Sequence, residues 1–169
     1  GTLTIASDAT LGTTANRTLA TPIALSASGT VSLTSSDLTL SGRITGAGSI
    51  AKTGTGTLTL SGSNSYSGGT TIAGPAGSNG FVKAGSDWAF GSGTITVAGT
   101  NSGGGNTLDV NGATLANAIV VAYINTGVNS DGALQNTNTS TAAVLNGTVA
   151  FAGQNYVGGN GDIVFNGVV

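Results

Sequence analysis

A five-residue pattern that returns along the chain constrains the fold more than any other feature. It reads GTLTI at residues 1–5, GTLTL at 56–60 and GTITV at 93–97, and a related NTLDV runs from 106 to 110. Within each copy aliphatic residues alternate with Thr or Asp, so a strand would send Leu or Ile to one face and polar groups to the other. The pattern predicts many short, half-buried strands.

Longer segments also recur, and they predict a stack of similar units. TLATPIAL at residues 18–25 corresponds to TLANAIVV at 114–121, and DLTLSGRI at 37–44 corresponds to DIVFNGVV at 162–169. A single coil cannot bury its own apolar face, whereas stacked coils close a column of Leu, Ile and Val off from water. Antiparallel hairpins are the alternative, because Asn-Gly steps are hairpin signals, but the recurrence of whole units favours a parallel solenoid.

Composition supports a folded β protein rather than a disordered chain. Of 169 residues, 30 are Gly and only 6% are charged, yet 38% are hydrophobic. Disorder combines low hydrophobicity with high charge, which is the opposite balance. Val, Ile and Leu interleaved with Thr and Ser suit a pleated surface. We therefore expect an all-β fold, one continuous solenoid over residues 1–169, with a polar surface insertion near residues 123–142, where periodicity is weak and turn formers gather.

The charged and sulfur-containing residues exclude several functions. The four basic residues, Arg17, Arg43, Lys52 and Lys83, are too few to neutralise a phosphate backbone, so nucleic acid is not an expected partner. The chain has no Cys and no His, which excludes thiolate chemistry and the commonest base of a nucleophilic triad. An export signal and a membrane anchor are expected outside this segment.

Residues 49–74, SIAKTGTGTLTLSGSNSYSGGTTIAG, resemble the β-strand repeat associated with autotransporter passenger domains. The matching features are Lys52 to Gly54, Gly56 to Leu60, Ser61-Gly62, Asn64, and Tyr66 to Ile72. The downstream segments AGSDWAFGSGTITV and GATLANAIVV are similar to the sequence that follows such a repeat, although Trp88 departs from it.

The resemblance implies a right-handed parallel β-helix in an extracellular, outer-membrane-associated protein of a Gram-negative bacterium. It also implies export by an outer-membrane β-barrel translocator outside this segment. We interpret the chain as a structural stalk of an autotransporter-type adhesin that aids secretion and cell-surface adhesion. Its expected partners are like copies, or a host or matrix surface that includes glycans. We expect no enzyme activity and no catalytic, cofactor or metal site. The alternatives are a self-assembling filament or sheath subunit, and a carbohydrate-binding or carbohydrate-active β-helix.

The acidic residues are the test of the carbohydrate-active alternative, because cleavage needs two carboxylates roughly 5 to 9.5 Å apart. The six acids are Asp8, Asp37, Asp87, Asp109, Asp131 and Asp162. Asp87, Asp109 and Asp131 are spaced by 109 − 87 = 22 and 131 − 109 = 22 residues, which is compatible with one coil. Stacked carboxylates would repel, so turn formation is the default interpretation.

Three further motifs have ordinary explanations. GGNGD at residues 158–162 resembles part of a calcium-binding nonapeptide, but it lacks that motif's spacing and is interpreted as a tight turn. The T-x-T segments at 2–4, 57–59 and 94–96 resemble ice-facing rows and are interpreted as outward Thr on ordinary strands. The clustered aromatic residues around Trp88 could stack on a glycan, but we expect them to cap the core.

Overall fold

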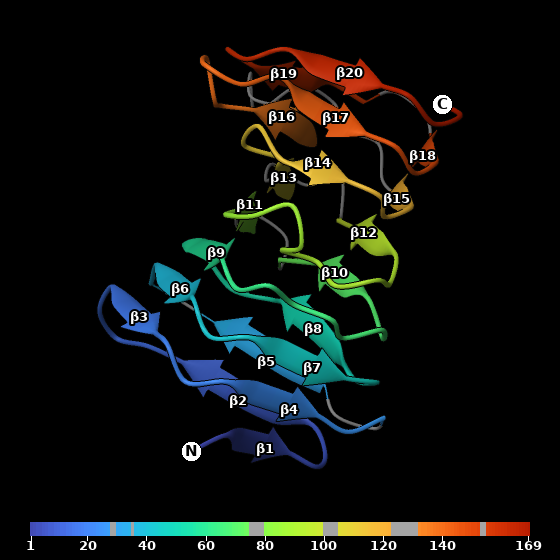
Figure 1. Cartoon of the computed structure of the whole chain (residues 1–169). Helices are drawn as coiled ribbons and strands as arrows, with labels where there is room; N and C mark the ends of the chain where they lie inside the picture. The colour runs from blue at the N-terminus through green and yellow to red at the C-terminus, as the bar shows by residue number, and fades with distance from the viewer. Residues whose placement is uncertain (28–29, 35, 75–79, 100–104, 123–131, 153–154) are drawn as a thin grey trace.

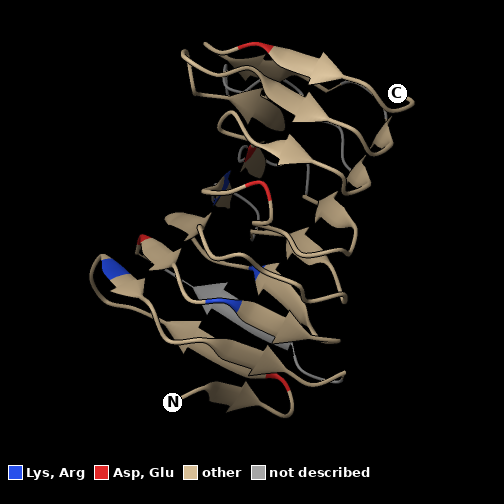
Figure 2. Ribbon diagram, in the orientation of Figure 1, with Lys and Arg blue, Asp and Glu red and all other residues tan. Residues whose placement is uncertain are grey.

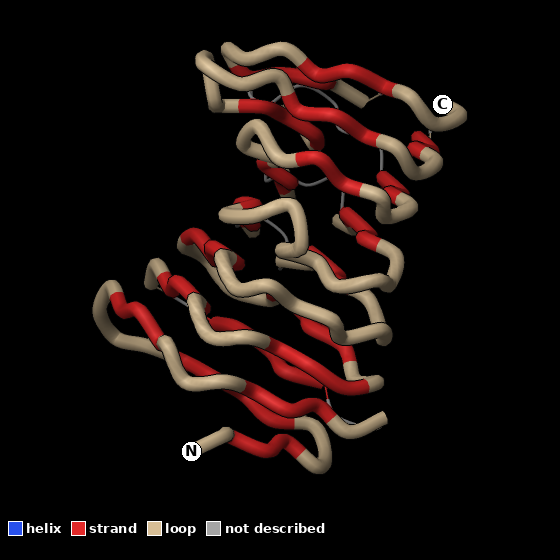
Figure 3. Tube along the Cα trace, viewed as in Figure 1, coloured by secondary structure: helices blue, strands red, loops and turns tan. Residues whose placement is uncertain are grey.

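The computed structural model describes residues 1–27, 30–34, 36–74, 80–99, 105–122, 132–152 and 155–169. These residues form twenty short strands and, within those ranges, no helix (Figures 1 and 3). Every strand pair is parallel, and the strands stack as a solenoid from the N-terminus to the C-terminus. The prediction of an all-β parallel solenoid is therefore confirmed. No helix in the described ranges could cross a membrane.

Two long sheets of seven strands run the length of the stack. The first long sheet has the order β18-β15-β12-β10-β8-β5-β2, and the second has the order β19-β16-β13-β11-β9-β6-β3. The chain passes from the first long sheet to the second and returns one coil later, so β8 pairs with β5 and β10. Parallel neighbours joined by such crossovers exclude the hairpin alternative.

The strands of the first long sheet are β2 (Ala9–Gly12), β5 (Thr30–Thr34), β8 (Ser49–Lys52), β10 (Thr70–Ile72), β12 (Ile95–Val97), β15 (Ile119–Val121) and β18 (Val149–Phe151). The strands of the second long sheet are β3 (Arg17–Leu19), β6 (Leu38–Leu40), β9 (Thr57–Leu60), β11 (Phe81–Ala84), β13 (Thr107–Asp109), β16 (Leu134–Asn136) and β19 (Val157–Gly159).

A third face consists of two three-stranded sheets, one near each end of the stack (Figure 1). Their strands are β1 (Leu3–Ile5), β4 (Ile23–Leu25), β7 (Ile44–Gly46), β14 (Thr114–Leu115), β17 (Ala143–Leu145) and β20 (Ile163–Phe165). Between the two sheets, residues 63–68 and 86–93 occupy this face without forming strands. Backbone bonds still link the coils there, for example from Ser65 N to Ile44 O at 2.8 Å and from Ser92 N to Tyr66 O at 3.0 Å.

Alternation along each strand builds the core. Leu38, Leu58, Val82, Leu108 and Leu134 lie in register on successive strands of the second long sheet, and all five are buried. Each buried side chain of this size contributes roughly 1.5 to 3 kcal/mol through removal from water. The interior is therefore a set of aliphatic columns that run along the axis, as the alternation in the sequence predicted.

The recurring segments do not occupy equivalent positions in the stack. The three GTLTI-like copies contribute to β1 on the third face, β9 in the second long sheet and β12 in the first. Likewise, residues 18–25 turn from the second long sheet onto the third face, whereas 114–121 turn from the third face into the first long sheet. The segments are alike because each corner requires the same chemistry, a strand that ends at a small residue and continues into another strand.

Close approach of the coils explains that shared corner chemistry. A Cβ on Gly42 would lie 2.3 Å from the carbonyl oxygen of Thr21, and one on Gly147 would lie 2.1 Å from that of Asn117. Both positions are therefore reserved for glycine although they belong to different corners. Coil length itself varies, from 49 − 30 = 19 residues between Thr30 and Ser49 to 149 − 119 = 30 between Ile119 and Val149.

Most of that variation falls at one edge of the stack. The connections from the first to the second long sheet span residues 53–56 after β8, but 73–80, 98–106 and 122–133 after β10, β12 and β15. The predicted insertion near 123–142 overlaps the longest of these, and its residues 123–131 lie outside the described ranges. Its later part differs from the expectation, because Leu134–Asn136 form β16 inside the second long sheet.

Candidate functional site

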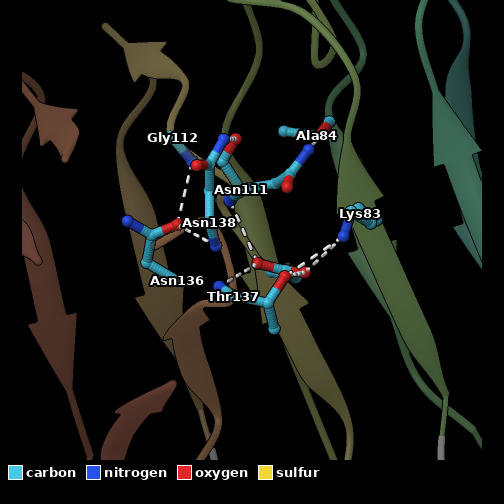
Figure 4. Close-up of polar contacts among 8 residues, drawn as sticks. Lys83, Ala84, Asn111, Gly112, Asn136, Thr137 and Asn138 are labelled. Carbon is cyan, nitrogen blue, oxygen red and sulfur yellow. Dashed lines mark hydrogen bonds and ion pairs between the residues drawn. The ribbon is translucent and has the colours of Figure 1, made fainter. Parts of the chain in front are cut away.

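A cluster of polar contacts surrounds Asp109 on β13 (Figure 4). Asp109 is in register with Lys83 of β11 on one side and with Gln135 of β16 on the other. Lys83 Nζ lies 3.3 Å from Asp109 Oδ2, and the side chains are 34% and 1% exposed, respectively. The carboxylate is thus a buried charge whose cation partner reaches in from the surface.

Hydrogen bonds from the same coil and from the next coil complete the environment of that carboxylate. Asp109 Oδ2 accepts a bond of 2.6 Å from the Thr137 hydroxyl, and Oδ1 accepts from the backbone N–H groups of Thr137 and Asn111 at 3.1 and 3.0 Å. A buried carboxylate is tolerated only with such a set of donors. Asp109 therefore joins neighbouring coils. The carbohydrate-active alternative requires a carboxylate that faces a surface groove, and Asp109 does not face one.

An asparagine ladder continues from this cluster along the axis (Figure 4). Asn111 Nδ2 donates to the carbonyl of Ala84 at 2.8 Å, and Asn138 Nδ2 donates to the carbonyl of Asn111 at 3.4 Å. Asn136 Oδ1 accepts from the N–H groups of Gly112 and Asn138 at 2.9 and 3.0 Å. These amide side chains form hydrogen bonds with backbone groups at the corner that have no partner in a β-ladder. The ladder is architectural.

The even spacing of Asp87, Asp109 and Asp131 does not produce a column. Asp87 lies in the turn between β11 and β12, where Oδ1 accepts from Thr114 N at 2.8 Å, while Asp109 lies in a strand. Asp131 lies outside the described residues. Charged residues are sparse along the ribbon (Figure 2), and no three acidic residues in the described ranges gather at a potential metal site. Asp87 therefore fits the turn interpretation.

Lys52 is the least expected residue of the interior. It follows Ile50 on the inward side of β8, is 1% exposed, and is in register with the buried Ile72. Its ammonium group donates to the carbonyls of Gly54 and, at 3.0 Å, of Thr55 in the turn that follows. Burial lowers the pKa of Lys52 from 10.5 to about 8, although the negative charge of Asp37 acts in the opposite direction. Lys52 thus fixes the corner before β9 from inside.

Asn64 and Tyr66 replace strand pairing where the third face has no strand. Asn64 Oδ1 accepts from Ile44 N at 2.8 Å, and its Nδ2 donates to the carbonyl of Ala89 at 2.7 Å, so one side chain joins three coils. Tyr66 is fully buried, with its hydroxyl 2.5 Å from Oγ1 of Thr70. Burial raises the pKa of Tyr66 well above its usual value. These contacts hold residues 63–68 in the stack.

The remaining sequence motifs do not lie together on one surface of the molecule. The T-x-T segments overlap β1, β9 and β12, which belong to three different faces, so they form no flat Thr array. Residues 160–161 of GGNGD bend between β19 and β20, and Gly161 N donates to Asn136 O at 2.9 Å, as expected for a turn.

The aromatic cluster divides between core and surface. Phe90 is fully buried, as a core cap requires, but Trp88 is 64% exposed, and the expectation that it covers the core is wrong. Trp88 borders an open hollow of about 210 Å³ that is also lined by Asp87, Gly91, Thr114, Ala116, Asn117 and Asn146. Phe90 lies on the same turn and anchors it in the core. The side chain of Trp88 therefore remains at the surface.

Comparison with known proteins gives one match. Residues 50–74 match the family model of the passenger-associated-transport-repeat, which confirms the resemblance over this segment. No curated protein and no solved structure matches the chain. The matched segment includes β10 and β9, the inward Lys52, and the Asn64 and Tyr66 contacts. The chain thus carries an autotransporter passenger repeat on a β-solenoid.

Proposed function

We propose that this chain is a stalk segment of the passenger of an autotransporter-type surface protein, secreted across the outer membrane and held at the cell surface. In this proposal its tasks are to aid secretion and to carry adhesive surfaces away from the membrane. The observation that carries the proposal is the repeat at residues 50–74. The parallel solenoid around it supplies a rigid, extendable rod.

The orientation of the repeat's residues supports a structural role. Lys52, Leu58, Leu60, Asn64 and Tyr66 are all buried. Side chains in the interior cannot meet a receptor, but they can set the stacking of one coil on the next. The repeat is therefore best explained as the part of the sequence that makes a coil stackable.

Coil-by-coil stacking also suits export through a narrow path. In a solenoid each unit contacts only its neighbours, so stability is close to a sum of unit and interface terms and folding can propagate from one end. Ladder contacts in this chain follow that rule, with β9 paired to β6 and β11 alone. A chain that emerges gradually could therefore fold as it appears, and folding outside the membrane would oppose its return.

In this proposal the chain is not an enzyme, and contacts with other molecules are made by its outer polar rows. The carboxylate of Asp109 is fully engaged by Lys83, Thr137 and Asn111. The formal net charge of −2 leaves little repulsion between neighbouring stalks. Like copies and a host or matrix surface are the partners that we propose.

Removal of one coil from the parent protein tests the stalk role. Leu38 and Leu58 lie in register, so deletion of residues 38–57 removes one strand from each face and brings Leu58 to the position of Leu38. We expect this variant to reach the cell surface at a level near that of the wild type, measured by protease accessibility on intact cells. Deletion of residues 38–47 is the control, because it removes β6 and β7 but keeps β8, so two strands of the first long sheet follow each other without a complete coil, and this should block display.

The composition of the native polypeptide provides the second test. Mass spectrometry of its peptides should find further KTGTGTLTL-like units and a set of amphipathic strands that could form a translocator. A native chain that contains neither would contradict the proposal, and so would equal surface display of the two deletion variants.

A further inference from the structure

The hollow beside Trp88 is built by three successive coils. Asp87 and Trp88 come from the turn after β11, Thr114 begins β14, Asn117 lies in the corner between β14 and β15, and Asn146 follows β17. The hollow has a volume of about 210 Å³. That is smaller than the roughly 300 to 1,000 Å³ of pockets that enclose drug-sized ligands. Its size suits one small ring rather than an enclosed large molecule.

The polar groups around the hollow are held in fixed positions. Asp87 Oδ1 accepts from Thr114 N at 2.8 Å, which anchors the carboxylate to the next coil. Asn117 is 7% exposed, and its Nδ2 donates to the carbonyls of Gly93 and Gly91 at 2.8 and 3.2 Å. Asn146 Oδ1 accepts from Asn166 Nδ2 at 3.0 Å. Groups that are already ordered lose little entropy when they bind a ligand.

Trp88 adds a large apolar surface to this polar frame. It is the only tryptophan of the chain and is 64% exposed, whereas Ala89 and Phe90 next to it are fully buried. The turn is therefore anchored in the core while the indole stands at the rim of the hollow. An exposed indole can stack on the C–H face of a ring, and its N–H can donate a hydrogen bond.

We infer that this hollow binds one ring of a neutral saccharide. The indole covers the apolar face of the ring, while the carboxylate of Asp87 and the amide of Asn146 contact its hydroxyl groups. No Lys or Arg lines the hollow, so an anionic ligand would find no counter-charge. The site differs from the carbohydrate-active alternative, since Asp109 takes no part and the hollow has one carboxylate rather than the two that cleavage needs.

The single tryptophan makes the test direct, because all indole fluorescence of the chain comes from Trp88. The whole chain is titrated with D-glucose, D-galactose and N-acetyl-D-glucosamine, and separately with tetramethylammonium as a cationic probe. We expect a saturable change in emission with at least one sugar, at Kd values on the order of 1 mM for so small a contact. A tethered oligosaccharide array of the same sugars gives a second readout that needs no fluorescence.

Variants separate the site from the fold. On the array, Trp88→Ala should weaken binding about tenfold or more and Trp88→Phe should retain most of it, while Tyr156→Ala, at a distant exposed aromatic, should change nothing. Asp87→Asn keeps an acceptor for Thr114 N and should weaken sugar binding. No saturable response to any of the sugars, or a response to tetramethylammonium alone, would overturn the inference. Neither result bears on the stalk proposal, which predicts display and not ligand binding.

Discussion

Lys83 Nζ and Asp109 Oδ2 lie 3.3 Å apart on neighbouring strands in register, yet the Lys side chain is 34% exposed and the Asp side chain only 1%. The two residues therefore differ in how well water can replace their partner when the ion pair breaks. Lys83 can turn to water, whereas Asp109 cannot.

The first prediction concerns that asymmetry. Asp109→Ala leaves the N–H groups of Asn111 and Thr137 without their acceptor and should lower the free energy of unfolding by about 3 kcal/mol, measured by urea denaturation. Lys83→Ala should cost less, about 1 to 2 kcal/mol, because the buried carboxylate of Asp109 loses its cation but keeps its other hydrogen-bond donors. Equal losses in the two variants would mean that the ion pair, rather than the hydrogen bonds, holds this corner.

The second prediction is a pH dependence centred on Lys52. The pKa of Lys52 is about 8 in the folded chain, below the ordinary 10.5 of an unfolded chain, so the unfolded state binds more protons between these values. The free energy of unfolding should therefore rise as the pH increases from 8 toward 10. Lys52→Met keeps the aliphatic stem and should flatten the rise. An identical pH profile for this variant would show that another group is responsible.

The third prediction concerns the buried hydroxyl of Tyr66. Tyr66→Phe removes the bond with Thr70 and leaves a buried threonine oxygen without that partner, so we expect a loss of about 1 kcal/mol. The raised pKa of Tyr66 means that the unfolded state releases its proton first above pH 10. Wild-type stability should therefore fall above pH 10, and this fall should be smaller in the variant. Tyr156→Phe, at an exposed position, is the control and should have neither effect.

The fourth prediction concerns coil spacing within the repeat. A Cβ at Gly62 would lie 2.4 Å from the carbonyl oxygen of Gly42 on the adjacent coil, where only backbone could move aside. Gly62→Ala should therefore destabilise the chain by roughly 1 to 3 kcal/mol. Ser63→Ala, at the exposed neighbour, should stay within about 0.5 kcal/mol of the wild type. Comparable thermal midpoints for the two variants would contradict this account.

The strand period of the sequence predicted the fold well because alternation of Leu and Thr reports directly which side is buried. Leu58 and Leu60 point inward as expected, with Thr59 between them half-buried. Coil register was not predictable from the same signal. Corners on all three faces use one chemistry, and coil length ranges from 19 to 30 residues, as the register pairs Thr30–Ser49 and Ile119–Val149 show. The equal spacing of the aspartates therefore did not predict equivalent positions in successive coils, since Asp87 lies in a turn and Asp109 in a strand.

The candidate sites were harder to predict, for different reasons. The inward position of Lys52 was readable, because Ile50 and Lys52 are two residues apart on one strand and must share a face. The exposure of Trp88 was not readable, since residues 86–93 interrupt the strand pattern and the sequence alone does not show which side of such a turn faces water. The environment of Asp109 depends on Thr137, which is 28 residues away.

The lengthening of one edge of the stack has a practical meaning. Connections after β10, β12 and β15 grow to spans such as 122–133, while the strands on either side keep their register with the coils above and below. Because closure of a longer loop costs only about 0.6 kcal/mol for each doubling of its length, that edge can accept new sequence with little loss of stability. It is therefore the place to graft an epitope, and the side of the molecule whose sequence can change most without rebuilding the rod.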